Sequence, residues 1–403
     1  MDRIEDVTAL FNDYADLSDD VQKRIIEIDN KPVRTKQLRK FSTREAANAL
    51  GISDSYLRRL VLEEGNLPSG KDQREGKRSF PLKDIRRIRE WLLGKTGDAR
   101  YRTKRTDDEK LQVIGFCNFK GGAAKTTSSV HFAQYLALRG YRVLLVDLDS
   151  QASATGWFGI SPDEEIDDLQ TLYGYMRGEV DTLRKVIRRT YWDQLDLIPA
   201  NLGLYRIEFE LPVRQLKEQN LRFWRLLRDG IQTVANDYDV VVCDAPPSLG
   251  YLSINAIVAS TGMVIPAPPS MLDFASTGRF FRMMSETLGD IIDFEGPEIV
   301  DLDFVRILTS RYSTADVNHK RIAGWMMANF GDALLENRMA VTTSLDMAGN
   351  IKRTLYELEP GTRKRSVDRG REYMDAVNCE LENLLLAQWG RPLLTAHHEE
   401  VVG

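Results

Sequence analysis

The sequence predicts an α/β protein in which a mostly parallel β-sheet is flanked by helices and preceded by a smaller α-helical domain. Three observations support this fold class. Apolar runs occur at residues 111–117, where Gln112 is the one polar residue, and at 143–146 and 240–243, and the last two end directly in aspartates. A glycine-bearing turn joins the first run to a segment with helical periodicity. Residues 31–105, which precede these runs, are basic and their apolar residues recur at three- and four-residue spacing.

Length and composition indicate a globular protein of two or three domains, because 403 residues exceed one ordinary core. The N-terminus, "MDRIEDVTAL", is acidic and lacks the basic-then-apolar pattern of an export signal. No apolar run approaches the length that spans a bilayer. We therefore expect a cytoplasmic protein with no membrane contact. The three cysteines are far apart and lack metal-ligand spacing, so neither a disulfide framework nor a zinc site is expected.

Residues 1–35 predict an N-terminal helix that mediates self-association. Apolar side chains recur at helical spacing between residues 3 and 28, as one amphipathic helix or as two with a break near "LSDD", and Pro32 ends the pattern. A single apolar stripe must pack against its own chain or against a second copy. We favour a homodimer contact.

Residues 36–97 predict a DNA-binding domain. Ser42 or Thr43 can cap a helix that ends at Leu50, and after a tight turn Ser53 can cap a second helix. A basic, glycine-punctuated hairpin and a third helix follow. Residues 31–105 hold 21 Lys and Arg against 9 Asp and Glu, although the whole chain has a net charge of −5. Such a basic block favours nucleic-acid binding.

This arrangement resembles the winged helix-turn-helix of the MerR-like class. Polar and basic side chains that point away from the packing of its helices are the candidates for contact with phosphates or base edges. We expect DNA contacts from Arg44, Ser55, Arg58, Arg59, Lys77 and Arg78. Residues 98–110 are polar and lack periodicity, so we interpret them as a linker to a third domain, residues 111–403.

The turn after the first apolar run is a phosphate-binding loop of unusual composition. The common loop reads G-x-x-x-x-G-K-[ST], but "FKGGAAKTT" carries Phe119 and Ala124 at the two glycine positions. A strand, a turn and a helix N-terminus together present backbone N–H groups to an anion. We expect Lys125 to contact the β- and γ-phosphates of a nucleotide and the Thr126 hydroxyl to ligate Mg²⁺.

Carboxylates follow two of the predicted strands. Asp147 and Asp149 end the strand in "YRVLLVDLDSQAS", and Asp244 ends "DYDVVVCD" in the pattern of a Walker B strand. Parallel strands present ligands at their carboxyl ends. Together with the loop, these acids predict one bound nucleoside triphosphate and its magnesium ion.

These motifs resemble the ParA/MinD family of ATPases. "KGGAAKTT" is similar to the family's deviant Walker A motif, K-G-G-x-x-K-[ST], "VDLDSQAS" to its V-D-x-D-P-Q segment and "CDAPPSLG" to its D-x-P-P segment. With a winged domain in front, the chain resembles the large plasmid-partition ParA proteins, in particular the RepA proteins of repABC plasmids. The resemblance covers residues 36–390.

The resemblance implies a P-loop NTPase fold and an ATP-bound sandwich dimer. Lys120 would reach across to the partner's phosphates, Asp149 would orient the attacking water and Asp147 would support the Mg²⁺ site. With Lys125, Lys120 and Asp149 form the implied catalytic set, and Thr126, Asp147 and Asp244 form the implied metal set. The implied ATP-binding residues are Lys120, Gly121, Gly122, Ala123, Ala124, Lys125, Thr126 and Thr127.

Two residues depart from the family pattern. Ala124 stands where glycine is usual, which costs on the order of 1 kcal/mol if that position needs a positive φ. Ser150 replaces the usual proline after Asp149. We expect both departures to modulate the site without abolishing it.

The resemblance also implies a function. An ATP-bound dimer would bind non-specific DNA on the nucleoid through a patch that Lys352 and Arg353 match best. A ParB-type centromere-binding partner would stimulate slow hydrolysis, and the winged domain would bind an operator to repress its own operon. The alternative is a nucleotide-regulated transcriptional repressor without partition activity.

Two further alternatives on the same fold are a MinD-like membrane-cycling ATPase and an iron–sulfur reductase. The first would require a basic amphipathic C-terminal helix, which "AQWGRPLLTAHHEEVVG" does not supply. The second would require cysteines placed to bridge a cluster at a dimer axis, and none of the three lies near the expected loops. The absence of an N-K-x-D guanine signature favours ATP.

Overall fold

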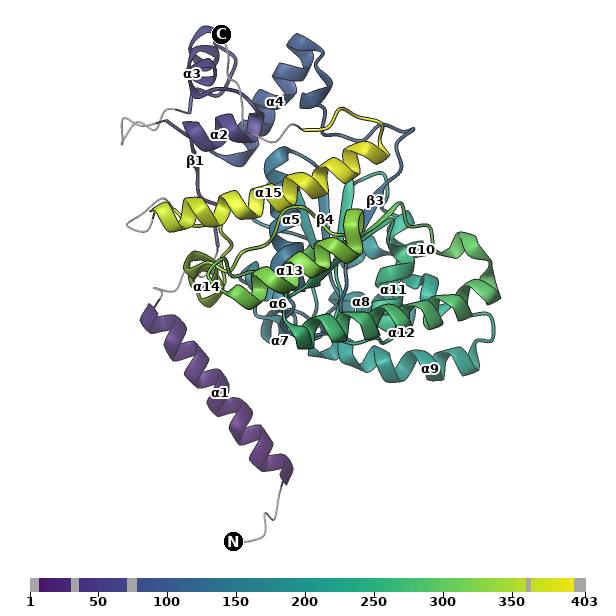
Figure 1. Ribbon diagram of the computed structural model, residues 1–403. Coiled ribbons are helices and arrows are strands. Elements are labelled where there is room, and N and C mark those ends of the chain that lie inside the picture. Colours follow the sequence, from purple (N-terminus) through teal and green to yellow (C-terminus); the bar gives the residue numbers. More distant parts are fainter. Residues whose placement is uncertain (1–6, 30–35, 71–77, 360–363, 395–403) are drawn as a thin grey trace.

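A seven-stranded sheet forms the centre of the computed structural model, which describes residues 7–29, 36–70, 78–359 and 364–394 (Figure 1). The strand order is β5-β6-β4-β7-β3-β8-β9, and every neighbouring pair is parallel except β5 with β6. The predicted fold class is therefore confirmed. The strands are β3 (Gln112–Phe116), β4 (Val143–Asp147), β5 (Arg188–Arg189), β6 (Leu195–Ile198), β7 (Val240–Asp244), β8 (Gly262–Ala267) and β9 (Phe304–Thr309).

Helices cover both faces of this sheet (Figure 1). Every residue of β3, β4 and β7 is buried, which explains their continuous apolar runs. The helices of the larger domain are α5 (Lys125–Arg139), α6 (Ser153–Trp157), α7 (Pro162–Glu165), α8 (Leu172–Arg177), α9 (Ile207–Lys217), α10 (Leu226–Gln232), α11 (Tyr251–Ala259), α12 (Met271–Glu295), α13 (Val317–Phe330), α14 (Thr343–Asn350) and α15 (Lys364–Gln388).

Alternate residues of the central strands enter two different hydrophobic cores. Val143 and Leu145 face a core built with α5 and α15, whereas Leu144 and Val146 face a core built with α8 to α12. The sheet thus separates two layers of helices, as expected for a parallel sheet that is buried on both sides.

The smaller domain consists of α2 (Thr43–Leu50), α3 (Asp54–Glu63), α4 (Leu82–Thr96) and a two-stranded sheet of β1 (Phe41–Ser42) with β2 (Ser79–Phe80). Ser42 caps α2 in a capping box with Glu45, and Ser53 caps α3. Gly51 ends α2 with a φ of 69°, a conformation that glycine adopts without strain. The predicted pair of helices and its tight turn are confirmed.

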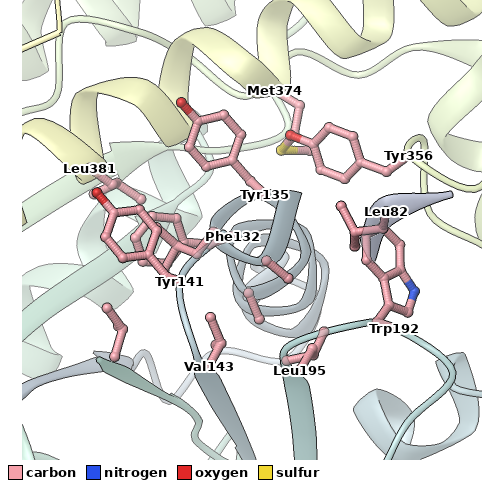
Figure 2. Packing of buried hydrophobic residues seen from close by; sticks show 14 of the residues in the cluster. Leu82, Phe132, Tyr135, Tyr141, Val143, Trp192, Leu195, Tyr356, Met374 and Leu381 are labelled. Atoms are coloured by element: carbon pink, nitrogen blue, oxygen red, sulfur yellow. The ribbon is translucent and has the colours of Figure 1, made fainter. Parts of the chain in front are cut away.

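The hydrophobic core of the smaller domain is continuous with that of the larger one. Buried residues of α2 and α4, such as Leu50 and Leu92, belong to the same cluster as Phe132 of α5 and Leu381 of α15. In Figure 2, Leu82 of α4 lies beside Trp192, and Phe132, Tyr135 and Tyr141 lie close to Leu381. The two domains therefore share one core.

A buried polar network crosses the same junction. Glu382 of α15 is 1% exposed and accepts hydrogen bonds from Tyr135 and Tyr141, each at 2.9 Å, and from Nε of Arg139 at 3.1 Å. Arg139 also donates to the carbonyl of Ala49 in α2 at 3.0 Å. The network fixes α2 against α5 and α15.

Residues 98–110, interpreted from the sequence as a linker, pack against the larger domain. Tyr101 is buried, Arg391 bonds Glu109 at 2.6 Å and the Trp389 indole donates to the carbonyl of Lys110 at 2.8 Å. The polar side chains of this segment form specific contacts with the larger domain. The sequence could not predict these contacts, because the segment has no helical or strand periodicity.

The N-terminal helix α1 (Val7–Asp29) is a single helix without a break near "LSDD". Figure 1 shows it extending away from the rest of the chain. Large apolar side chains on it are exposed, namely Val7, Phe11, Tyr14, Leu17 and Val21. Self-association through this helix remains a prediction.

Within the described ranges, the helices are too short or too polar to cross a membrane.

Candidate functional site

The phosphate-binding loop lies between β3 and α5, at the carboxyl end of the sheet. Gly122 has a φ of 74° and Ala124, which precedes the first turn of α5, has a φ of 71°. The position of Ala124 thus requires the left-handed conformation, where an alanine costs roughly 1–2 kcal/mol. This strain is located where the loop turns its N–H groups toward an anion.

Neighbouring strands brace the loop. The Asn118 amide donates to the carbonyl of Pro266 at 2.8 Å, and its oxygen accepts from the backbone N–H of Lys120 at 3.1 Å. The buried Ser310 hydroxyl donates to the carbonyl of Ala123 at 2.8 Å. Sequence reasoning missed Asn118 and Ser310, since only the folded sheet brings the ends of β8 and β9 beside the loop.

Lys125 begins α5 and its side chain is buried under the loop. Its ammonium donates to the carbonyl of Lys120 at 3.2 Å. Burial lowers the pKa of Lys125, while the nearby carboxyl of Asp244 acts in the opposite direction. A cation held in this position is suited to a bound phosphate chain.

Asp147 and Asp244 lie next to each other because β4 and β7 pair in a register that aligns them. Both are fully buried. Asp147 accepts hydrogen bonds from the backbone N–H and hydroxyl of Thr155, at 2.8 and 2.7 Å. In the part of the chain that the structure describes, neither oxygen of Asp244 accepts a hydrogen bond of ordinary geometry, although the hydroxyls of Thr126 and Ser129 lie close enough to lower its pKa.

Burial raises the pKa of both carboxyls, to about 8 for Asp147 and about 7 for Asp244. The negative charge of Asp244 adds to the effect on Asp147, while the Thr126 hydroxyl lowers the pKa of Asp244. Two adjacent buried carboxyls that resist ionisation form a site where a divalent cation is stabilising.

The residues fit a magnesium ion. Asp244 offers two unpaired oxygens and Thr126 a hydroxyl, which are donors that Mg²⁺ prefers. The oxygens of Asp147 already accept hydrogen bonds, so this carboxylate fits a supporting position. Among the described residues, histidine, cysteine and carboxylate side chains form no group of three or more that could hold a metal. Mg²⁺ would therefore also need phosphate oxygens and water, as is usual for this ion.

Asp149 lies just beyond β4, in the turn that leads to α6. Its N–H donates to Asp147 at 3.2 Å, and its carboxylate accepts from the N–H of Gln151 at 2.9 Å. Asp149 is half-buried and near Lys125. The structure thus brings Lys125, Asp147, Asp149 and Asp244 together.

A cavity of about 400 Å³ adjoins the start of α5. Its walls come from the loop, from the segment after β9 and from α14. It is large enough for a nucleoside and opens beside Ala124 and Thr127. The lining residues include Trp157, Arg311, Met339, Val341 and Asp346, none of which sequence reasoning selected.

The side chain of Lys120 points elsewhere. Its ammonium forms an ion pair with Asp273, in the first turn of α12. Gly121 and Gly122 are exposed, and a Cβ atom at either position would meet open space. The loop is therefore accessible at the surface at these two glycines.

The predicted DNA contacts lie in two separate places. Arg44, Ser55, Arg58 and Arg59 are exposed on α2 and α3. Arg78 donates to the carbonyl of Ser69 at 2.6 Å, so it links the two described segments that flank residues 71–77. Lys77 lies outside the described residues.

Lys352 and Arg353 follow α14, far from the winged domain in the sequence. Lys352 is exposed and has a φ of 50°. Its carbonyl accepts a hydrogen bond from the ammonium of Lys36, which also donates to the carbonyl of Trp157 at 2.6 Å. Burial lowers the pKa of Lys36, opposed by Glu357. Lys36, at the start of the smaller domain, therefore joins that domain to the loop that carries Lys352.

Comparisons with known proteins agree with this geometry. A family model described as "AAA domain" matches residues 111–291. The chain is 39% identical to a "Putative replication protein A" of Rhizobium rhizogenes over 394 residues, covering 96% of each chain. It is 34% identical to protein SopA of Escherichia coli K12, covering 82% of this chain and 83% of that one. The chain belongs to the ParA family of ATPases.

Solved structures show the same fold. A structure titled "Partition Protein" covers 92% of this chain and 99% of its own, at a TM-score of 0.64 and 20% identity. Cobyrinic acid a,c-diamide synthase from Mycobacterium smegmatis, with a bound ATP analogue and magnesium, covers 72% of this chain and all of its own, at a TM-score of 0.53 and 26% identity.

Proposed function

We propose that this chain is a plasmid-partition ATPase that binds ATP with Mg²⁺, dimerises and then binds DNA without sequence preference. The observation that carries the proposal is the unpaired, buried carboxylate of Asp244 beside Thr126 and Lys125, under a braced phosphate loop. A divalent cation stabilises the ionised form of such a carboxyl, and a nucleotide–magnesium complex supplies one.

Different residues of the chain have different roles in nucleotide binding and hydrolysis. Lys125 and the loop N–H groups hold the phosphates, and the cavity lined by Trp157 and Val341 holds the nucleoside. Asp149 orients the attacking water. Lys120 of the second copy approaches the phosphates, where it neutralises charge that develops during phosphoryl transfer. Bound Mg²⁺ would supply further neutralisation of the same charge.

DNA binding is assigned to two surfaces with different roles. Exposed Arg58 and Arg59 would contact an operator, through which the chain would repress its own operon. Lys352 and Arg353, close to the nucleotide cavity through α14, would contact non-specific DNA in the ATP state. A ParB-type partner would stimulate hydrolysis and release the dimer.

The test compares two double variants of the full chain, because the winged domain shares its core with the ATPase and cannot be removed. Lys352→Asn with Arg353→Gln keeps a residue that tolerates the left-handed conformation at position 352. Arg58→Gln with Arg59→Gln is the matched control. Binding to a random-sequence duplex is measured with ATP, with ADP and without nucleotide.

We expect ATP-dependent binding to be lost in the first pair and retained in the second, with the salt dependence reduced by about one unit of slope per lost phosphate contact. If the wild-type chain bound the duplex equally in all three nucleotide states, the partition proposal would be wrong. Loss of binding only in the Arg58 and Arg59 pair would favour a nucleotide-regulated repressor.

A further inference from the structure

The side chain and the backbone of Lys120 are held by different parts of the molecule. Its N–H donates to Asn118 and its carbonyl accepts from the Lys125 ammonium at 3.2 Å, so the backbone is fixed within the loop. The ammonium instead contacts a carboxylate oxygen of Asp273, in α12. Only side-chain torsions must change for the ammonium to move, because the loop around it is braced.

The carboxylate of Asp273 is itself held in place. Its other oxygen accepts a hydrogen bond from the Ser270 hydroxyl, which also accepts from the N–H of Asp273 at 3.2 Å. The side chains of Asp273 and Lys120 are 14% and 36% exposed. The carboxylate of Asp273 is therefore held in position, whereas the ammonium of Lys120 is accessible to solvent.

The surroundings of this pair face solvent. Met271 and Leu272, in the same turn of α12, are 57% and 79% exposed. A second copy of the chain can therefore reach Lys120 without displacing a buried segment. The ammonium of Lys120 can contact either the fixed carboxylate of its own protomer or an anion on the other copy.

We propose that Asp273 is a positioning residue that holds Lys120 on its own protomer and so opposes dimerisation until nucleotide is bound. The inference rests on the proposed function, in which Lys120 crosses to the partner. A triphosphate carries more negative charge than one carboxylate, so it can displace Asp273 as the partner of Lys120. Without nucleotide, the ion pair keeps the lysine from offering a dimer contact.

The strength of the effect follows from the exposure of the pair. A partly exposed ion pair lowers the population of the free, binding-competent lysine only modestly, by about two- to five-fold. Removing the pair should strengthen ATP-dependent dimerisation by the same factor, because a conformational equilibrium scales the apparent affinity by the competent fraction.

The experiment uses Asp273→Asn in the full chain. Asp290→Asn is the matched control, since Asp290 is an exposed carboxylate on the same helix. Sedimentation equilibrium with a non-hydrolysable ATP analogue measures dimerisation, and mass spectrometry after brief acylation measures the reactivity of the Lys120 amine in the nucleotide-free protein. A merely structural role for Asp273 would not change that reactivity.

We expect Asp273→Asn to dimerise about two- to five-fold more tightly and to acylate faster at Lys120, and Asp290→Asn to match the wild type in both. Unchanged or weaker dimerisation of Asp273→Asn would overturn the inference. If this variant fails to fold, as judged by thermal unfolding, Asp273→Ser keeps a small polar residue in the turn and is held to the same outcomes.

Lys120→Ala separates the inference from the function on which it rests. If Lys120→Ala still dimerised with the ATP analogue, the crossing of Lys120 and this inference would both be wrong. If Lys120→Ala failed to dimerise while Asp273→Asn behaved as wild type, the proposed function would stand and only the role of Asp273 would be rejected.

Discussion

Two buried carboxylates, Asp244 of β7 and Glu382 of α15, lie near opposite ends of α5 and differ in how their oxygens are paired. Glu382, at the domain junction, accepts hydrogen bonds from two tyrosines and an arginine. Asp244, in the candidate site, accepts none within the described residues. A paired buried charge stabilises a junction, whereas an unpaired one retains its capacity for a ligand. Both acids are buried, so the pairing of their carboxylate oxygens, more than their burial, distinguishes Glu382 of the domain junction from Asp244 of the candidate site.

The largest expected effect is at the junction. Glu382→Gln leaves Arg139 without a counter-charge and offers an amide donor to groups that already donate, so we expect the free energy of unfolding to fall by about 3–5 kcal/mol. Urea denaturation measures it, with Glu372→Gln on the exposed side of α15 as the control. A loss no greater than that of the control would show that the network does not stabilise the junction.

The next prediction concerns the unpaired acid. Asp244→Asn should reduce ATP hydrolysis about 100-fold, because a metal contact is lost. The nucleotide-free protein should become more stable at pH 8, by about 1–3 kcal/mol, because the carboxyl, with a pKa of about 7, no longer has to ionise while buried. Because the pKa of Asp244 is raised in the folded state, its protonated carboxyl contributes fully to the free energy of unfolding below about pH 4. This contribution is lost as the pH rises through 7.

Asp239→Asn provides the matched control for that result. Asp239 immediately precedes β7, is buried, pairs with Arg142 at 2.6 Å and accepts from the N–H of Arg105 at 2.8 Å. We expect this variant to lose stability at pH 8. Equal changes in the two variants would contradict the comparison between paired and unpaired acids.

A third buried group, His131, is paired only in its neutral form. Its Nδ1 lies 2.7 Å from the carbonyl of Thr127, and its Nε2 accepts from the N–H of Leu355 at 3.2 Å. Burial lowers the pKa of His131 to about 4. Because the pKa of His131 is lowered in the folded state, its neutral imidazole contributes fully to the free energy of unfolding above pH 6.5. This contribution is lost as the pH falls toward 4.

We therefore expect His131 to account for about 2 kcal/mol of stability lost between pH 7 and pH 4.5. His131→Gln should show a smaller pH dependence of the urea midpoint over that range, while His319→Gln, on a more exposed histidine, should keep the wild-type dependence. Equal slopes in all three proteins would mean that other groups dominate acid unfolding.

The smallest effect is expected at Ala124. Ala124→Gly relieves the strain of a φ of 71° but increases the entropy of the unfolded chain, so we expect a gain of only about 0.5 kcal/mol. Ala133→Gly, in the middle of α5, should instead cost about 1 kcal/mol. Thermal unfolding distinguishes the two signs, and a loss of stability in Ala124→Gly would refute the strain argument.

Sequence patterns predicted the sheet, the helix caps at Ser42 and Ser53 and the placement of the loop, because these depend on neighbouring residues. The carboxylates could also be selected, since parallel strands present their carboxyl ends together. The pairing of Lys120 with Asp273 could not be predicted, because it joins positions 153 residues apart that only the fold brings together. The bracing by Ser310 and the role of residues 98–110 depend on long-range packing for the same reason.

The shared core has a mechanical consequence. Since α2 and α4 are fixed to α5 and α15, the exposed arginines of α3 keep a set direction relative to the phosphate loop. The smaller domain and the ATPase domain therefore move as one body. In the proposed dimer, a rotation between the two ATPase domains would change the distance between the two proposed operator-binding surfaces by the same motion. If the proposed operator has two half-sites, we expect their spacing to match the geometry of the proposed dimer.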